Sequence, residues 1–163
     1  MERYLKDIEA WCWRYLEMER SYPGLHFTAK PRACDAIFEC VGQLRSSGFG
    51  SHRTIPLRDL GPAEEARISG GLRYRCFRRL RITLHEESDE LRQFAFRALD
   101  DTVHFELTER YLADFEQGIR DVQSGVGDYS ISPRGEGRLL GSLDRESECL
   151  WFWPCFGHLS VIP

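Results

Sequence analysis

The sequence predicts an α+β fold in which an antiparallel β-sheet carries about three helices packed on one side. Two hydrophobic patterns support this prediction. Apolar residues recur at helical spacing in three segments, and elsewhere they alternate with polar residues as they do in strands. The chain has 163 residues, 42% of them hydrophobic, which is enough to bury a sizeable core. It has no internal repeat and no linker, so residues 1–163 are expected to form a single globular domain.

Three main helices are expected from apolar spacing and from residues that begin or end helices. The first covers residues 4–20, with apolar side chains at helical spacing at Leu5, Ile8, Cys12, Tyr15 and Leu16. The second covers residues 31–48 and begins with a proline, which suits a first helical turn. The third has Thr108 as its N-cap and ends at Gly125. A shorter helix is expected to begin at residues 61–65.

Strand-like alternation is clearest in residues 72–85, where most even positions are apolar and most odd positions are basic. The pattern changes phase once, at Phe77 and Arg78, which indicates a bulge or a bend. Shorter extended segments are expected at residues 25–29, 53–57, 128–131 and 150–153. The last segment is apolar on both faces, so its aromatic side chains are expected to be largely buried: Trp151, Phe152 and Trp153.

A β-hairpin is expected around a two-residue turn at Asp100 and Asp101. This register sorts the facing residues by polarity, and a shift by one residue would destroy the sorting. The apolar pairs are Ala98 with Val103, Phe96 with Phe105, and Phe94 with Leu107. The pairs on the other face are Arg97 with His104, and Ala95 with Glu106.

Composition excludes several classes of protein. The net charge of −4 and the pI near 5.8 argue against general binding to nucleic acid or to an anionic membrane. No apolar stretch reaches the ~20 residues of a membrane helix. The first residues carry acids where a signal peptide has an apolar segment, so the protein is expected to be cytoplasmic. Its six cysteines are then expected to be buried free thiols.

The sequence carries no recognised catalytic signature. His85 is followed by two glutamates but lacks the second histidine of a zinc-protease helix, and the glycines at 135–141 lie in a loop-like segment rather than opening a helix. Cys149, Cys155 and His158 are three candidate metal ligands, but their spacing does not match structural zinc sites. We therefore expect no catalytic residues, no metal and no cofactor, and a binding protein in preference to an enzyme.

The most distinctive polar feature is a set of basic side chains expected on one face of the sheet, which we call the Arg face. Its residues are Arg73, Arg75, Arg79, Arg81, Arg97 and His104. Guanidinium groups bind carboxylate and phosphate through paired hydrogen bonds, so this face is expected to hold an acidic protein partner or an anionic ligand. The alternative is an ordinary solvated face neutralised by nearby glutamates, with Glu106 as the internal counter-charge.

Residues 108–153 contain a helix followed by Gly-Val-Gly-Asp-Tyr-Ser-Ile and then Leu-Trp-Phe-Trp. This arrangement resembles the C-terminal end of several small uncharacterised bacterial protein families, some of them similar to immunity proteins that neutralise a toxin by binding it. The resemblance implies that Asp128 and Trp153 fix the sheet and take no part in chemistry. It also implies a bacterial protein-binding module that works through a surface.

Two functions therefore remain open on the sequence alone. One is a non-enzymatic, immunity-like binding protein of the bacterial cytoplasm. The other is a small enzyme or ligand-binding protein with an Arg-lined pocket for phosphate or carboxylate. A flat Arg face would favour the first, and basic side chains converging in a pocket with an acid or a histidine would favour the second.

Overall fold

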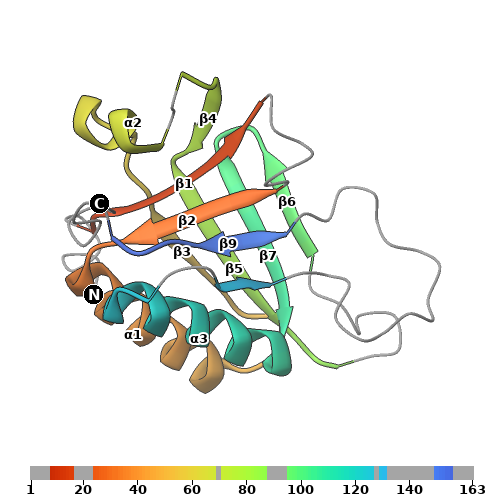
Figure 1. Cartoon of the computed structure of the whole chain (residues 1–163). Helices are drawn as coiled ribbons and strands as arrows, with labels where there is room; N and C mark the ends of the chain where they lie inside the picture. Colours follow the sequence, from red (N-terminus) through yellow and green to blue (C-terminus); the bar gives the residue numbers. More distant parts are fainter. Residues whose placement is uncertain are drawn as a thin grey trace.

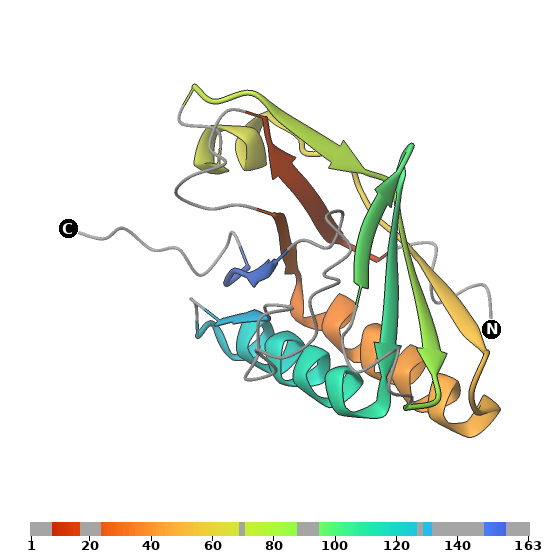
Figure 2. The same cartoon turned by 90° about the vertical axis from the view of Figure 1, so that its right-hand side faces the viewer.

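The structure, a computed structural model of the chain, describes residues 8–16, 24–68, 71–87, 95–126, 129–131 and 149–155. These residues form nine strands and three helices, so the predicted α+β class is confirmed. The strands are divided between two sheets, which converge at the top of Figure 2, while α1 and α3 lie side by side below them. The main hydrophobic core fills the space that the two sheets and these two helices enclose.

Sheet A has five strands and sheet B has four. In spatial order, sheet A contains β4 (Tyr74–Phe77), β1 (Ala10–Tyr15), β2 (Leu25–Ala29), β9 (Leu150–Phe152) and β8 (Tyr129–Ile131). Sheet B contains β3 (His52–Pro56), β5 (Arg79–His85), β7 (Thr102–Thr108) and β6 (Ala95–Leu99). Two neighbouring pairs are parallel, β2 with β9 and β5 with β7, so neither sheet is purely antiparallel. Figure 1 shows sheet A in front of sheet B.

The helix expected over residues 4–20 is wrong for the part that the structure describes, because Ala10–Tyr15 is strand β1. The four residues that begin this strand are all buried, which a one-sided surface helix does not allow. Cys12 belongs to the main core, whereas Trp11 and Trp13 belong to a second cluster on the other face of the sheet. Tryptophans at alternate positions fit a strand that is covered on both faces.

The other expected helices are confirmed. Helix α1 spans Pro31–Ser47 with the proline in its first turn, and the short helix α2 spans Pro62–Ile68. Helix α3 spans Glu109–Ser124 and ends at Gly125, whose φ of 75° is the left-handed conformation typical of a helix C-cap. Thr108 occupies the N-cap position, but its side chain makes no capping hydrogen bond.

The predicted hairpin is confirmed in its register. Strands β6 and β7 pair through Phe96 with Phe105, Arg97 with His104, and the other predicted pairs within the described residues. The pairing of Phe94 with Leu107 lies outside those residues because position 94 is not described. Asp100 turns the chain with a φ of 50°, a left-handed conformation that aspartate tolerates better than most residues.

The change of phase at Phe77 and Arg78 marks a change of sheet. The chain leaves sheet A at Phe77, which pairs with Cys12, and enters sheet B at Arg79. The turn between β6 and β7 is hydrogen-bonded to this junction: the carbonyl oxygen of Asp101 accepts from the backbone N–H groups of Arg78, at 2.7 Å, and Arg79, at 3.2 Å. The two sheets are therefore joined both by the continuous chain and by this turn.

Five phenylalanine rings connect sheet B to sheet A through α3. Consecutive ring centroids lie 4.2, 5.6, 5.9 and 6.1 Å apart along the series Phe96, Phe105, Phe115, Phe152 and Phe27. All are buried, and most adjacent rings meet edge to face, which is a favoured aromatic geometry. Phe152 of β9 is fully buried as expected. Trp151 of β9 and Trp153, which follows the strand, lie on the opposite face and are only partly buried, so the expected burial is wrong for these two.

Replacing Gly118 by alanine should destabilise the protein. A Cβ atom at this position of α3 would lie 2.5 Å from ring carbons of Phe152, so the ring or the helix would have to move. We expect Gly118→Ala to lower the free energy of unfolding by about 1–3 kcal/mol, as overpacked cores do. Chemical denaturation measures this change.

Gly42 provides a matched control because it is an exposed glycine within α1 and its added Cβ would meet nothing within 4 Å. Gly42→Ala should raise the free energy of unfolding by about 0.5–1 kcal/mol through helix propensity. If both substitutions stabilise the protein, the close packing of Phe152 on α3 is wrong.

Candidate functional site

The outer face of sheet B carries a row of polar side chains that crosses all four strands. Register pairs Thr54 of β3 with Arg81 of β5, Arg81 with His104 of β7, and His104 with Arg97 of β6. The alternate residues of β5 and β7, such as Ile82 and Phe105, are fully buried in the core. We call Thr54, Arg81, His104 and Arg97 the basic row.

The row next to the basic row, in which Arg79 of β5 pairs with Thr102 of β7, contains one arginine that is already neutralised. Nη2 of Arg79 donates to Oδ1 of Asp101 at 2.6 Å, and its Nε donates to the hydroxyl of Thr102 at 3.1 Å. The guanidinium lowers the pKa of the Asp101 carboxyl below its usual value, mainly through this hydrogen bond. Arg79 therefore has a carboxylate partner within its own chain, although it remains exposed.

The row on the other side of the basic row contains Glu106, which the sequence suggested as counter-charge for the Arg face. Glu106 lies beside Thr83 of β5 and opposite Ala95 of β6. Its carboxylate contacts Nε2 of His85 at the end of β5. Among the described residues, its side chain thus contacts a histidine and none of the arginines.

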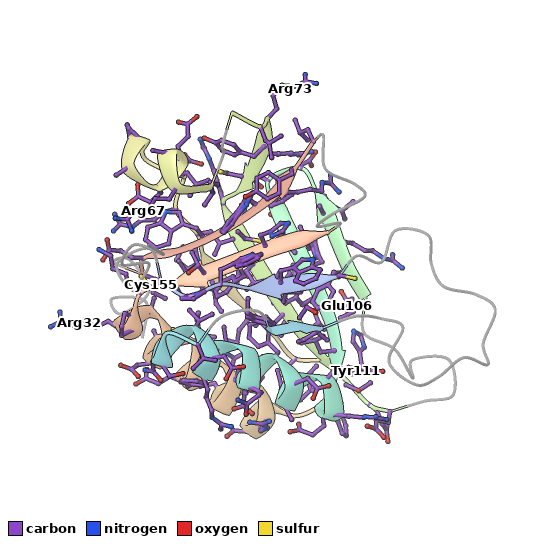
Figure 3. All side chains as sticks on the ribbon, viewed as in Figure 1. Arg32, Arg67, Arg73, Glu106, Tyr111 and Cys155 are labelled. Carbon is purple, nitrogen blue, oxygen red and sulfur yellow. The ribbon has the colours of Figure 1, made fainter. Side chains whose placement is uncertain are left out.

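Two members of the Arg face lie outside sheet B. Arg75 is in β4, and its guanidinium donates to the carbonyl oxygen of Asp100 while lying 5.5 Å from the ring centroid of Phe77. Arg73 precedes β4, and Figure 3 shows its side chain at the top of the molecule, far from Glu106. The change of sheet at Arg78 separates them from the basic row, so the expectation of one continuous Arg face is wrong.

The members of the basic row differ in exposure. Arg97 and Thr54 are exposed, whereas Arg81 and His104 are partly buried among their neighbours. Within the residues that the structure describes, Arg81 makes no side-chain hydrogen bond or ion pair. The sequence did not indicate Thr54 as part of this site. Thr54 reaches it because β3 pairs with β5, and no local sequence pattern shows that these two strands are neighbours.

A second cluster lies on the outer face of sheet A, and we call it the aromatic layer: Trp11, Trp13, Tyr15, His26, Trp151 and Trp153. His26 is 0% exposed and stacks between Trp13, at 5.5 Å, and Trp153, at 6.0 Å between centroids. Its Nδ1 accepts a hydrogen bond of 2.9 Å from Nε1 of Trp153. The sequence signal for this layer is the alternation of tryptophans in two segments, at positions 11 and 13 and at positions 151 and 153.

The aromatic layer is packed as a small second core. Ile68 of α2 and Leu60 pack against its tryptophans, and the hydroxyl of Tyr15 donates to the carbonyl oxygen of Ile68 at 2.7 Å. Burial raises the pKa of Tyr15 above its usual value. The layer therefore joins α2 to sheet A and is a weaker candidate for a binding site than the open basic row.

All six cysteines are free thiols. Cys155 is buried and Cys149 is partly buried, while His158, the third candidate ligand considered above, lies outside the described residues. No group of three or more His, Cys, Asp or Glu side chains that could hold a metal ion occurs within the ranges that the structure describes. Burial raises the pKa of the Cys34 thiol to about 12.

No protein-family model, curated protein or solved structure matches this chain. In the described part of the chain, no helix is both long and apolar enough to cross a membrane. Function therefore has to be inferred from the geometry of the site. The basic row is the best candidate because it brings together Arg81, Arg97 and His104 of the predicted set.

The thiols should react slowly in the folded protein. Cys34 is fully buried, and its raised pKa keeps it in the unreactive thiol form at neutral pH. Burial also raises the pKa values of Cys40 and Cys76. A thiol reagent should label all six cysteines after denaturation without reductant. Fewer than six equivalents would indicate a disulfide or a bound metal, and metal analysis would distinguish the two.

Proposed function

We propose that this protein is a non-enzymatic binding module that uses the basic row to hold an acidic surface of a protein partner. The observation that supports this most directly is the placement of Arg81, His104 and Arg97 at one register level on three adjacent strands. Side chains so placed stand next to one another on the sheet face. This arrangement suits a partner surface better than a pocket in which groups converge.

Charge supports the same proposal. Among the described residues, Asp101 is paired with Arg79 and Glu106 contacts His85, both outside the basic row. The guanidinium of Arg81 has no side-chain hydrogen bond or ion pair within the described residues, so it presents positive charge on a protein whose net charge is −4. A local positive patch on an acidic protein attracts acidic partners selectively, since the rest of its surface repels them.

The resemblance of residues 108–153 to immunity-like proteins points in the same direction, because such proteins act by binding. We therefore extend the proposal to an immunity-like role in the bacterial cytoplasm, where the six free thiols would stay reduced. Of the two residues behind the resemblance, Trp153 follows β9 and donates a hydrogen bond to His26 of sheet A, whereas Asp128 lies outside the described residues. Trp153 would support the fold, while the basic row on sheet B would contact the partner.

Reversing one charge in the basic row should weaken binding to an acidic probe. We expect a polyglutamate peptide to bind the protein, and Arg81→Glu to weaken this binding at least about tenfold, because it removes a guanidinium and adds a like charge. Binding should also weaken with added salt, which screens exposed charges over about 8 Å at physiological ionic strength. Fluorescence anisotropy of a labelled peptide measures both effects.

Arg32→Glu is the matched control, because it makes the same change of charge at an exposed position of α1, and Figure 3 shows Arg32 at the opposite side of the molecule from Glu106. Circular dichroism checks that both variants are folded. If Arg32→Glu weakens binding as much as Arg81→Glu does, the attraction is one of overall charge and the proposed site is wrong.

A further inference from the structure

We infer that this protein forms a symmetric dimer in which the outer edge of strand β3 pairs with β3 of a second copy. The inference goes beyond the function proposed above and does not rest on it. Strand β3 ends sheet B on one side, with β5 as its neighbour. An edge strand presents backbone N–H and C=O groups to any strand that can pair with it. The edge of β3 is complementary to itself, which identifies the partner as a second copy.

The hydrogen bonds at the two ends of the β3–β5 pairing show which backbone groups of β3 face outward. At one end the N–H of Leu57 donates to the carbonyl oxygen of Arg78 at 2.8 Å, and at the other end the N–H of Leu84 donates to that of Ser51 at 3.0 Å. In an antiparallel pair every second residue is bonded to the neighbouring strand, so the odd-numbered residues of β3 bond to β5. The residues whose backbone groups point away from β5 are His52, Thr54 and Pro56.

In the part of the chain that the structure describes, most of these outward groups have no hydrogen-bond partner. The N–H groups of His52 and Thr54 have no acceptor there, and the carbonyl oxygens of Thr54 and Pro56 have no donor. The carbonyl oxygen of His52 is the exception, because it accepts from Nη1 of Arg53 at 2.8 Å. Pro56 has no N–H to offer.

An antiparallel pairing of β3 about Thr54 satisfies every one of these groups. Thr54 then lies opposite Thr54 of the second copy, and the N–H of each donates to the carbonyl oxygen of the other. His52 lies opposite Pro56 of the second copy and donates to its carbonyl oxygen. The reverse bond is missing because proline has no N–H, but its acceptor would be the carbonyl oxygen of His52, which Arg53 already satisfies. The only bond that this register lacks is therefore one that the edge does not need.

The side chains of β3 leave this edge open. Edge strands are commonly protected by charged side chains, lysine above all. The one arginine of β3, Arg53, is held against α1 instead: its Nη2 donates to the hydroxyl of Ser47 at 2.9 Å and its Nε to Oε1 of Gln43 at 3.3 Å. Thr54 is exposed, and two threonines that face each other across strands form a favourable pair.

An exposed aromatic side chain lies just before this edge. Phe49 is 59% exposed and belongs to the turn between α1 and β3. The turn is fixed to sheet B, because the N–H of Gly50 donates to the carbonyl oxygen of Leu84 at 2.7 Å. Phe49 thus adds apolar surface at the end of β3 that a second copy can cover. In the dimer, sheet B continues from one copy into the other.

Amide hydrogen exchange in the unmodified protein tests the inference residue by residue. We expect exchange at the His52 and Thr54 amides to slow at least about twofold as the protein concentration rises from about 10 μM to about 1 mM, the range in which a small interface associates. The amides of Arg53 and Ile55, which face β5, should show no such change. Sedimentation equilibrium over the same range should show monomer converting to dimer.

Charged substitutions at Thr54 test the register. Thr54→Lys sets like charges opposite each other at the symmetry axis and should weaken self-association at least about threefold, and Thr54→Glu should do the same. An equimolar mixture of the two variants should associate again, because lysine then faces glutamate. Thr83→Lys is the matched control: it makes the same change on the same face of the sheet, but on β5, and should leave association unchanged. Circular dichroism checks that the variants are folded.

Three outcomes would overturn the inference. A protein that stays monomeric at the highest concentration does not use this edge. A dimer in which the His52 and Thr54 amides exchange as fast as in the monomer is formed through another surface. Association of Thr54→Lys and Thr54→Glu that equals that of the unmodified protein excludes the register about Thr54. The exchange measurement needs no substitution, so it remains decisive if a variant fails to fold.

Discussion

The fold depends on the contact between α3 and the short strand β9. Phe152 of β9 lies against the helix at Gly118, where only a glycine leaves room for its ring, and it continues the series of phenylalanines that begins in sheet B. This contact joins the two sheets into one hydrophobic core. Sheet B packs its inner face against the same core, and the alternation of its strands leaves Arg81 and His104 on the outer face. The basic row is therefore a consequence of core packing.

Local patterns predicted the elements whose partners are close in sequence. The hairpin of β6 and β7 was predicted to the residue, because only one register sorts Phe96 and Arg97 onto opposite faces with matching neighbours. Helices α1 and α3 were predicted because proline, threonine and glycine mark their ends. These signals act over a few residues, so the sequence shows them directly.

Pairings between distant segments could not be predicted in this way. The parallel pairing of β5 with β7 sets Arg81 beside His104, but parallel neighbours have no turn that fixes their register. The phase change at Arg78 indicated a bend, yet a bend within one sheet and a move to another sheet leave the same local pattern. Helical spacing in residues 4–20 was misleading because β1 is buried on both faces. Apolar residues then occupy most positions, and such a run fits the spacing of a helix as well as that of a strand.

The position of β9 also has a consequence for how the chain folds. His26 and Trp153 are hydrogen-bonded although they lie 127 positions apart, and β9 sits between β2 and β8 in sheet A. Closing so long a loop costs conformational entropy before any contact repays it, and such non-local pairings slow folding. During synthesis, the strands of sheet B and the helices α1 and α3 leave the ribosome before β9 does. Sheet A is therefore completed last, and until then the edge of β2 that β9 will cover is open to pairing with another chain.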